Sequence, residues 1–326
     1  MLIVFILKKL QVDQGYKFTS DTDTEVIAHA IDFFMQSSNS LLEAVQKSLK
    51  TLKGSYGLGV ISSKHPDIII AARKGSPLLI GIGKNGNYIS SDQMALLTVT
   101  KKFIFLEEGD VALLNLDKVT IYNKKGNLVD RPIEISNLKE GQVDLGNYSH
   151  FMQKEMFEQP TVLANTFAGR IAENHIREAI FGYQAEELFQ QTQAVHIIAC
   201  GTSFHSGLVA KYWLEQYAGI PCQVEVASEY RYRTVPVPAG TLFVTISQSG
   251  ETADTLAALR KAKDSGYLGF VAICNVANSS LVRESDISLM TMAGPEIGVA
   301  STKAFTNQLA VLAMLACKAA TDRGTM

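Results

Sequence analysis

Three short segments of this 326-residue sequence combine hydroxyl side chains with glycine or other small residues. They are Cys200-Gly201-Thr202-Ser203 (loop 1), Ser247-Gln248-Ser249-Gly250-Glu251-Thr252 (loop 2) and Gly298-Val299-Ala300-Ser301-Thr302-Lys303 (loop 3). Each segment stands before a helical pattern, so its hydroxyls and free backbone N–H groups are expected at the positive end of a helix. Phosphates and polyols are bound by such groups. The three loops therefore predict a site for a phosphorylated sugar.

The alternative is that these Ser and Thr residues only cap helices, as they do in many proteins. One such loop would favour that explanation. Loop 2, however, supplies more polar groups than a single cap can use, and all three loops are expected on one edge of a sheet. We therefore favour a binding site over capping alone.

The second half of the chain alternates between strand and helix patterns. Apolar runs expected to form strands lie at 195–199, 223–226, 242–246, 269–273 and 287–291. Helical patterns lie at 203–217, 252–263, 280–284 and 302–319. Near-continuous apolar strands that alternate with helices predict a doubly wound α/β fold with a parallel sheet covered on both faces. Ligands of such folds bind at the carboxyl ends of the strands, which is where loops 1 and 2 fall.

The first half has a different pattern. Two amphipathic helices are expected near 26–34 and 42–52, and short β runs follow at 56–61, 68–72, 78–81, 103–106, 111–114 and 119–122. Helices followed by runs of strands predict an α+β domain that is mostly antiparallel. A polar stretch rich in Gly and Asp at 137–149 is expected to be a linker, which gives domains at 1–136 and 150–326.

Other motifs offer weaker evidence of chemistry. The segment 81–86 matches the dinucleotide pattern GxGxxG, but strand or turn residues follow it, so a hairpin is expected. His205 is a candidate to face the ligand, although a lone helical histidine is more often structural, and the other five histidines show no metal-ligand spacing. Cys200 lacks a supporting His–Asp pair, so packing or a backbone contact is expected there.

Three charged residues near the loops have open roles. Lys303 could contact a phosphate or be an ordinary surface lysine, and the sequence does not decide between the two. Glu251 and Glu296 could act as acids, but solvated positions are the default expectation for both.

Composition excludes several classes of protein. With 47% hydrophobic and 19% charged residues and a net charge of -2, the chain gives no electrostatic reason to expect nucleic acid or an anionic membrane as partner. Its four cysteines form no CxxC pair and stand in apolar surroundings, as reduced thiols of a cytoplasmic protein do. The apolar runs at 1–7 and 309–316 are shorter than the roughly 20 residues that span a bilayer.

Loops 1, 2 and 3, with the stretches at 151–160, 227–233 and 272–286, resemble the first sugar isomerase (SIS) domain of the glutamine–fructose-6-phosphate aminotransferases. The stretches at 19–31, 71–83 and 103–114 resemble the later part of the glutaminase domain of that family. The resemblance therefore covers nearly the whole chain. It implies an SIS-type α-β-α sandwich preceded by a partial α+β Ntn-type glutaminase domain.

The resemblance implies a function as well as a fold. Family members transfer ammonia from glutamine to fructose 6-phosphate and form glucosamine 6-phosphate, without a metal or an organic cofactor. By resemblance, the sugar phosphate is held by Thr202, Ser203, Ser247, Gln248, Ser249 and Thr252, in loops that include Gly201. Cys200, Val299 and Ser301 are expected to line the sugar, and Asp23 matches a carboxylate that binds the amino group of glutamine. A homodimer formed through the SIS domain is also implied.

Departures from the family pattern change what is expected of this polypeptide. Residue 2 is Leu2 and no cysteine precedes Cys200, so the N-terminal nucleophile of the glutaminase has no counterpart. The second SIS domain, which supplies the proton-transfer groups, also has no counterpart. We therefore expect a chain that binds the sugar phosphate and catalyses neither half-reaction alone. A non-catalytic sugar-phosphate sensor and a split enzyme completed by a second chain are the alternatives.

Overall fold

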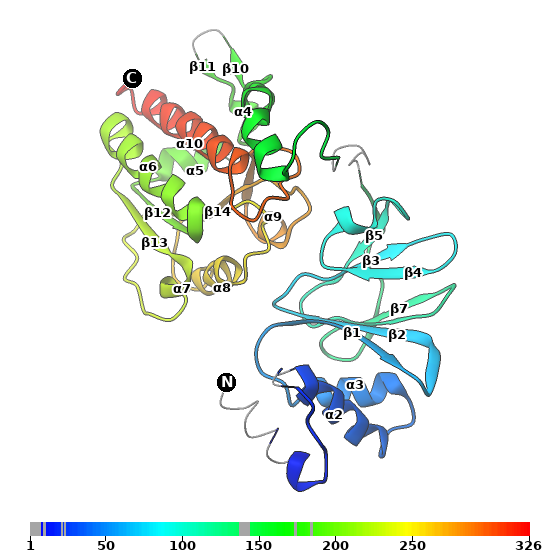
Figure 1. Ribbon diagram of the computed structural model, residues 1–326. Helices are drawn as coiled ribbons and strands as arrows, with labels where there is room; N and C mark the ends of the chain where they lie inside the picture. The colour runs from blue at the N-terminus through cyan, green and yellow to red at the C-terminus, as the bar shows by residue number, and fades with distance from the viewer. Residues whose placement is uncertain are drawn as a thin grey trace. The chain divides into compact units, whose positions relative to one another are not determined.

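A computed structural model describes residues 8, 11–20, 22, 24–136, 144–172, 175–182 and 185–326. The chain divides into two compact units, Met1–Glu140 and Gly141–Met326 (Figure 1). Within the described residues, no helix is both long enough and apolar enough to cross a bilayer. Asp23 and residues 137–143 of the expected linker lie outside the described residues.

Unit 1 packs helices against two antiparallel sheets. From residue 24 onward, the helices of its described residues are α2 (Thr24–Met35) and α3 (Leu41–Leu49), with a short 3-10 helix η1 (Gln93–Leu96). One sheet has the order β1-β2-β6-β7-β8, formed by Tyr56–Ser62, His65–Lys74, Val111–Leu114, Val119–Tyr122 and Leu128–Val129. The other has the order β4-β3-β5-β9, formed by Asn87–Ser90, Leu79–Ile82, Lys102–Phe105 and Glu134–Ile135. The α+β, antiparallel prediction for the first half is confirmed.

Strand β2 explains how this unit packs, because both of its faces are buried. Ile70 and Ala72 face the cluster that holds the α2 and α3 side chains, whereas Ala71 belongs to the cluster formed with β3 and β5. Alternate residues of a strand point to opposite faces, so one apolar strand serves two cores. The GxGxxG segment is the turn between β3 and β4, where the N–H of Gly83 donates to the carbonyl of Gly86. The predicted hairpin is confirmed.

Unit 2 is built on a five-stranded parallel sheet in the order β13-β12-β14-β15-β16. These strands are Cys222–Val226, Ala194–Ala199, Thr241–Ser247, Gly269–Cys274 and Ile287–Met290. The helices are α4 (Phe151–Phe167), α5 (Ala185–Gln191), α6 (Gly201–Ala218), α7 (Ala227–Tyr230), α8 (Ala253–Ala262), α9 (Ser280–Arg283) and α10 (Lys303–Asp322). Two short antiparallel strands lie between α4 and α5, β10 (Ile171–Ala172) and β11 (His175–Ile176). The 3-10 helix η3 (Glu178–Ile180) follows them. The doubly wound α/β prediction is confirmed.

Helices cover both faces of the parallel sheet. Ile197 and Val244 belong to the core shared with α5, α6 and α10. Their neighbours Ile198 and Phe243 belong to the core shared with α7 and α8 (Figure 1). The α6 helix approaches the sheet closely at Gly207, where an added Cβ would lie 2.9 Å from a methyl carbon of Ile197. This packing fixes the first turn of α6 above the end of β12.

Candidate functional site

Loops 1 and 2 leave the sheet side by side. Ala199, the last residue of β12, pairs with Ile246 of the neighbouring strand β14. Cys200 and Ser247 directly follow this pair along β12 and β14, and therefore lie together at the carboxyl edge of the sheet. A ligand at this edge would meet the N-termini of α6 and α8, as in other open parallel sheets.

Loop 3 is brought to the same edge by side chains that the sequence did not single out. Gln308 on α10 donates through Nε2 to Ser203 Oγ on α6, at 3.0 Å, and both residues are buried. Asn275, after β15, donates its backbone N–H to the carbonyl of Gln248 and accepts the N–H of Ala293 at its side-chain oxygen. The structure therefore gathers the three predicted loops. Gln308 and Asn275 gave no sequence signal, because an isolated amide has no periodicity.

Within loop 1 the residues differ in exposure. Thr202 and Gly201 are exposed, and Gly201 has φ +57, a conformation that favours glycine. Ser203 is buried and its hydroxyl is occupied by Gln308. Cys200 is half-buried and packs against the core on the α7 and α8 side of the sheet, as expected. Thr202 therefore carries an exposed hydroxyl, and Ser203 links α6 to α10 through its oxygen.

Loop 2 is ordered by its own hydroxyls. Ser247 Oγ lies 3.0 Å from Thr252 Oγ1 and accepts the N–H of Gly250 at 3.0 Å. Ser249 Oγ accepts the N–H of Glu251 at 3.2 Å. Thr252 is the residue before α8, yet its side chain makes no capping hydrogen bond to that helix. The backbone N–H groups at the start of α8 therefore receive no side-chain cap from Thr252, which suits an anion.

A buried thiol stands behind loop 2. Cys274 Sγ lies 3.7 Å from the carbonyl oxygen of Gln248 and 3.4 Å from Ser279 Oγ. Burial raises the pKa of Cys274, so the group stays a neutral thiol and can donate to these oxygens. Cys274 is therefore part of the support for loop 2.

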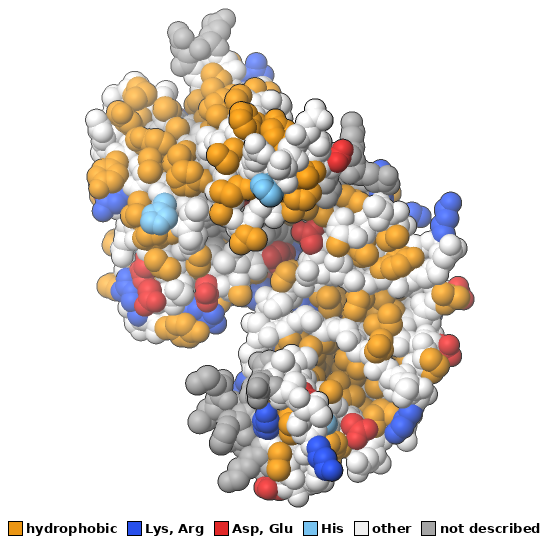
Figure 2. All heavy atoms as spheres, in the orientation of Figure 1, with side chains coloured by type: hydrophobic (Ala, Val, Ile, Leu, Met, Phe, Trp, Pro, Cys, Tyr) orange, Lys and Arg blue, Asp and Glu red, His pale blue; other side chains and the backbone are white. Residues whose placement is uncertain are grey.

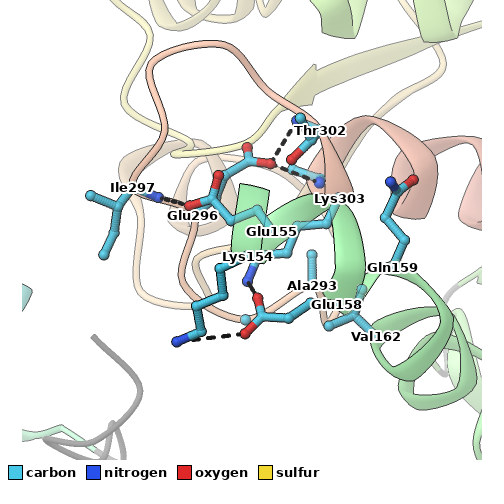
Figure 3. A network of polar contacts seen from close by, with 12 residues as sticks. Lys154, Glu155, Glu158, Gln159, Val162, Ala293, Glu296, Ile297, Thr302 and Lys303 are labelled. Atoms are coloured by element: carbon cyan, nitrogen blue, oxygen red, sulfur yellow. Dashed lines mark hydrogen bonds and ion pairs between the residues drawn. The ribbon is translucent and has the colours of Figure 1, made fainter. Parts of the chain in front are cut away.

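Loop 3 is capped by carboxylates, which the sequence did not predict. Glu296 accepts the backbone N–H groups of Thr302 and Ala304, at 2.9 and 3.1 Å, and the hydroxyl of Ser301 at 2.9 Å (Figure 3). The expectation that Glu296 is simply solvated is wrong, because the residue is half-buried and closes the start of α10. Its position seven residues before the first residue of α10 fits no short capping motif, which is why sequence reasoning missed it.

Two further charged residues also have structural partners. Lys303 is buried, and its Nζ lies 2.6 Å from Glu158 Oε2 on α4, so its charge is paired with a carboxylate of that helix (Figure 3). Glu251 is half-buried and accepts the N–H of Ser280 at 2.7 Å, so the solvated position expected for it is also wrong. His205 is exposed on α6, with its ring against Phe204. No group of three or more His, Cys, Asp or Glu is placed to hold a metal ion in the part of the chain that the structure describes.

Comparison with known proteins identifies a family domain within unit 2. Residues 187–318 match the family described as SIS domain. Glutamine–fructose-6-phosphate aminotransferase (isomerizing) of Pseudomonas putida is 56% identical over 314 residues, which make up 96% of this chain and 51% of that protein. The protein of the same name from Pseudomonas aeruginosa is 58% identical over 303 residues, 92% of this chain and 49% of that protein.

One solved structure is also similar to part of this chain. The C-terminal domain of glucosamine-fructose-6-phosphate aminotransferase from Francisella tularensis is 53% identical, with a TM-score of 0.55, over 56% of this chain and 52% of that chain. The chain spans about half the length of the curated relatives that it matches.

Proposed function

Since this chain is a homologue of the glutamine–fructose-6-phosphate aminotransferases and carries an SIS domain, we propose that it binds fructose 6-phosphate or glucosamine 6-phosphate at loops 1, 2 and 3. The phosphate is held by the hydroxyls and backbone N–H groups of loops 1 and 2. The sugar lies along Cys200, Val299 and Ser301.

The start of α8 is the observation that carries this proposal. Ser249 and Thr252 stand there at the carboxyl edge of the sheet, with the exposed Thr202 on the neighbouring loop. Thr252 leaves the helix N-terminus without a side-chain cap. Hydroxyl donors and free N–H groups at a helix N-terminus form a phosphate site. Glu251 and Glu296 accept backbone N–H groups, so we assign these two carboxylates to the support of the loops.

Thermal unfolding with added sugar phosphate tests the proposal. Ligand at 100 times its Kd stabilises the folded protein by about 2.7 kcal/mol, which raises the melting temperature measurably. The double variant Ser249→Ala with Thr252→Ala should lose this shift. A matched control is Ser285→Ala with Thr321→Ala, whose hydroxyls donate to the backbone carbonyls of Leu281 and Cys317. The control should keep the shift.

Two results would contradict the proposal. The first is a folded chain whose melting temperature does not respond to either sugar phosphate. The second is a shift that survives in the loop 2 double variant, because the ligand would then be bound elsewhere. Inorganic phosphate and fructose should be tested alongside, to separate recognition of the phosphate from recognition of the sugar.

The remaining parts of the chain are assigned by homology. We propose that residues 1–136 are the later part of a glutaminase domain, joined by 137–149 to the SIS domain at 150–326. The identity over 96% of the chain supports this assignment. In a protein as long as its relatives, the sugar phosphate held here would be the acceptor of nitrogen from glutamine, and Asp23 would contact that glutamine. The free cysteines agree with a cytoplasmic location.

Unit 2 also has an apolar face suited to self-association. Figure 2 shows hydrophobic side chains gathered over the region of α4, α6 and α10. Met156 and Phe157 on α4 and Tyr212 on α6 are 51%, 65% and 69% exposed. Large exposed apolar side chains of this kind mark interaction surfaces. We therefore assign the proposed homodimer to unit 2, and sedimentation of the chain would test it.

A further inference from the structure

The first helix of unit 2 lies outside the region that matches the SIS family, yet its side chains contact loop 3 and the residues on either side of it. The match covers residues 187–318, whereas α4 spans Phe151–Phe167. Between β16 and α10 the chain runs through residues 291–302 without helix or strand. A segment of this length has little order of its own, so its shape depends on what holds it.

α4 holds the beginning and the end of this segment. At the beginning, Thr166 Oγ1 donates to the carbonyl of Thr291 at 2.6 Å, and Asn307 Nδ2 donates to the same oxygen at 3.1 Å. At the end, Lys303 forms its buried ion pair with Glu158. Thr291, Thr166, Asn307 and Lys303 are all buried, whereas the carboxylate of Glu158 is partly exposed.

The middle of the segment rests on one carboxylate. Glu155 is 2% exposed, and its Oε1 accepts the N–H groups of Ile297 and Gly298, at 2.6 and 3.0 Å (Figure 3). Its other oxygen, Oε2, is buried and accepts no hydrogen bond from the described residues. A Cβ on Gly298 would lie 2.6 Å from that oxygen, so any larger residue at 298 would force the carboxylate of Glu155 to shift.

A buried carboxylate with one unsatisfied oxygen costs stability, and hydrophobic packing alone would not require it. Two backbone N–H groups directed at a single oxygen fix both the position and the orientation of the peptide units before Val299. Val299 itself is fully exposed, and Ser301 is held from the other side by Glu296. The two glutamates thus hold the backbone on either side of the residues proposed to line the sugar.

We propose that Glu155 and Glu296 are positioning residues for the sugar-binding part of the site, and that α4 belongs to the functional unit. They touch no ligand. They hold loop 3 in the shape that receives the sugar, while loops 1 and 2 hold the phosphate independently. This inference rests on the proposed function, and it adds residues and a helix that the family match does not include.

Binding of two probes to the full chain tests the inference. Glu155→Ala should weaken the binding of fructose 6-phosphate by about 10-fold or more, since hydrogen bonds to a charged group are lost. Binding of inorganic phosphate should change less than about 3-fold, because loops 1 and 2 are untouched. Glu155→Gln should recover most of the affinity for the sugar phosphate, because its amide oxygen can accept the same two N–H groups. Gly298→Ala should act like Glu155→Ala. Asn165→Ala, an exposed change on the same helix, is the control.

Hydrogen exchange of the peptide around 295–305 gives a readout that needs no ligand. Exchange should accelerate in Glu155→Ala and stay near the wild-type rate in Glu155→Gln. An equal loss of affinity for fructose 6-phosphate and inorganic phosphate in a folded Glu155→Ala protein would overturn the inference. Unchanged binding and unchanged hydrogen exchange would also overturn it. A wild-type chain that binds neither probe would contradict the proposed function, and the exchange rates would then decide the role of Glu155 separately.

Discussion

Removing Glu158 should destabilise unit 2 more than removing Lys303, although the two residues form one ion pair. The side chain of Lys303 is 4% exposed and its Nζ lies 2.6 Å from Glu158 Oε2, whereas the side chain of Glu158 is 31% exposed. Glu158→Ala leaves a buried ammonium group without its carboxylate. Lys303→Met leaves a carboxylate that water can reach and that Lys154 Nζ approaches to 3.7 Å. The cost of the two changes is therefore unequal.

The magnitudes follow from burial. Loss of one partner from a fully buried pair costs about 3–5 kcal/mol. Because water already reaches Glu158, we expect about 2–3 kcal/mol for Glu158→Ala. Lys303→Met replaces the cation by an apolar side chain of similar length, and we expect less than about 1 kcal/mol. The two variants should thus differ by about 2 kcal/mol in free energy of unfolding.

Urea unfolding followed by tryptophan fluorescence measures this difference in unit 2 alone. Trp213 is the single tryptophan of the sequence, and it packs on α6 against the core shared with α10. With a denaturant slope of about 1–3 kcal/mol per molar for small proteins, Glu158→Ala should lower the midpoint by roughly 1 M. Lys303→Met should lower the urea midpoint by only a few tenths of the shift expected for Glu158→Ala.

A Lys303→Met variant that is as unstable as Glu158→Ala would refute the reasoning, because Lys303 would then stabilise the unit by packing instead of requiring its partner. The exposed pair Lys211–Glu215, with Nζ and Oε1 3.8 Å apart and both side chains at least 40% exposed, is the control. Removing Lys211 should change stability by less than about 0.5 kcal/mol. Glu215 is kept in this control because it also accepts the N–H of Cys222.

Two further changes have defined outcomes with the same fluorescence assay. Gly250→Ala should lower the free energy of unfolding by more than about 3 kcal/mol, because φ is +67 and the new Cβ would lie 2.0 Å from Ser279 Oγ. Gly266→Ala is the control and should cost about 1 kcal/mol, because φ is +81 but the space around the new Cβ is open. Equal losses of stability in the two variants would contradict the steric argument. Burial lowers the pKa of His196, so as pH falls below about 6.5 the unfolded chain takes up the proton first and stability drops, by at most about 1.4 kcal/mol per pH unit. His196→Phe should remove that part of the pH dependence, and an unchanged slope between pH 7.5 and 5.5 would show that another group titrates.

Much of the architecture could be read from the sequence, because it depends on local periodicity. The five strands of unit 2 were expected within one or two residues of their observed ends, and the antiparallel first half and its 81–86 hairpin were expected as well. Apolar runs of strand length followed by small and hydroxyl residues also marked loops 1 and 2. Carboxyl ends of parallel strands share one edge of a sheet, so those loops could be placed together without a structure.

The supports of the candidate site were decided only by the tertiary structure. Nothing in the local sequence of Glu155 shows that it accepts N–H groups from residues 142 and 143 positions further along the chain. Lys303 and Glu296 could not be told from surface charges, because their burial comes from the packing of α4 against α10 and the path of loop 3. Periodicity reports which face of an element is apolar. It does not report which distant polar group will meet a backbone donor once the elements pack, and that pairing gives loop 3 its shape.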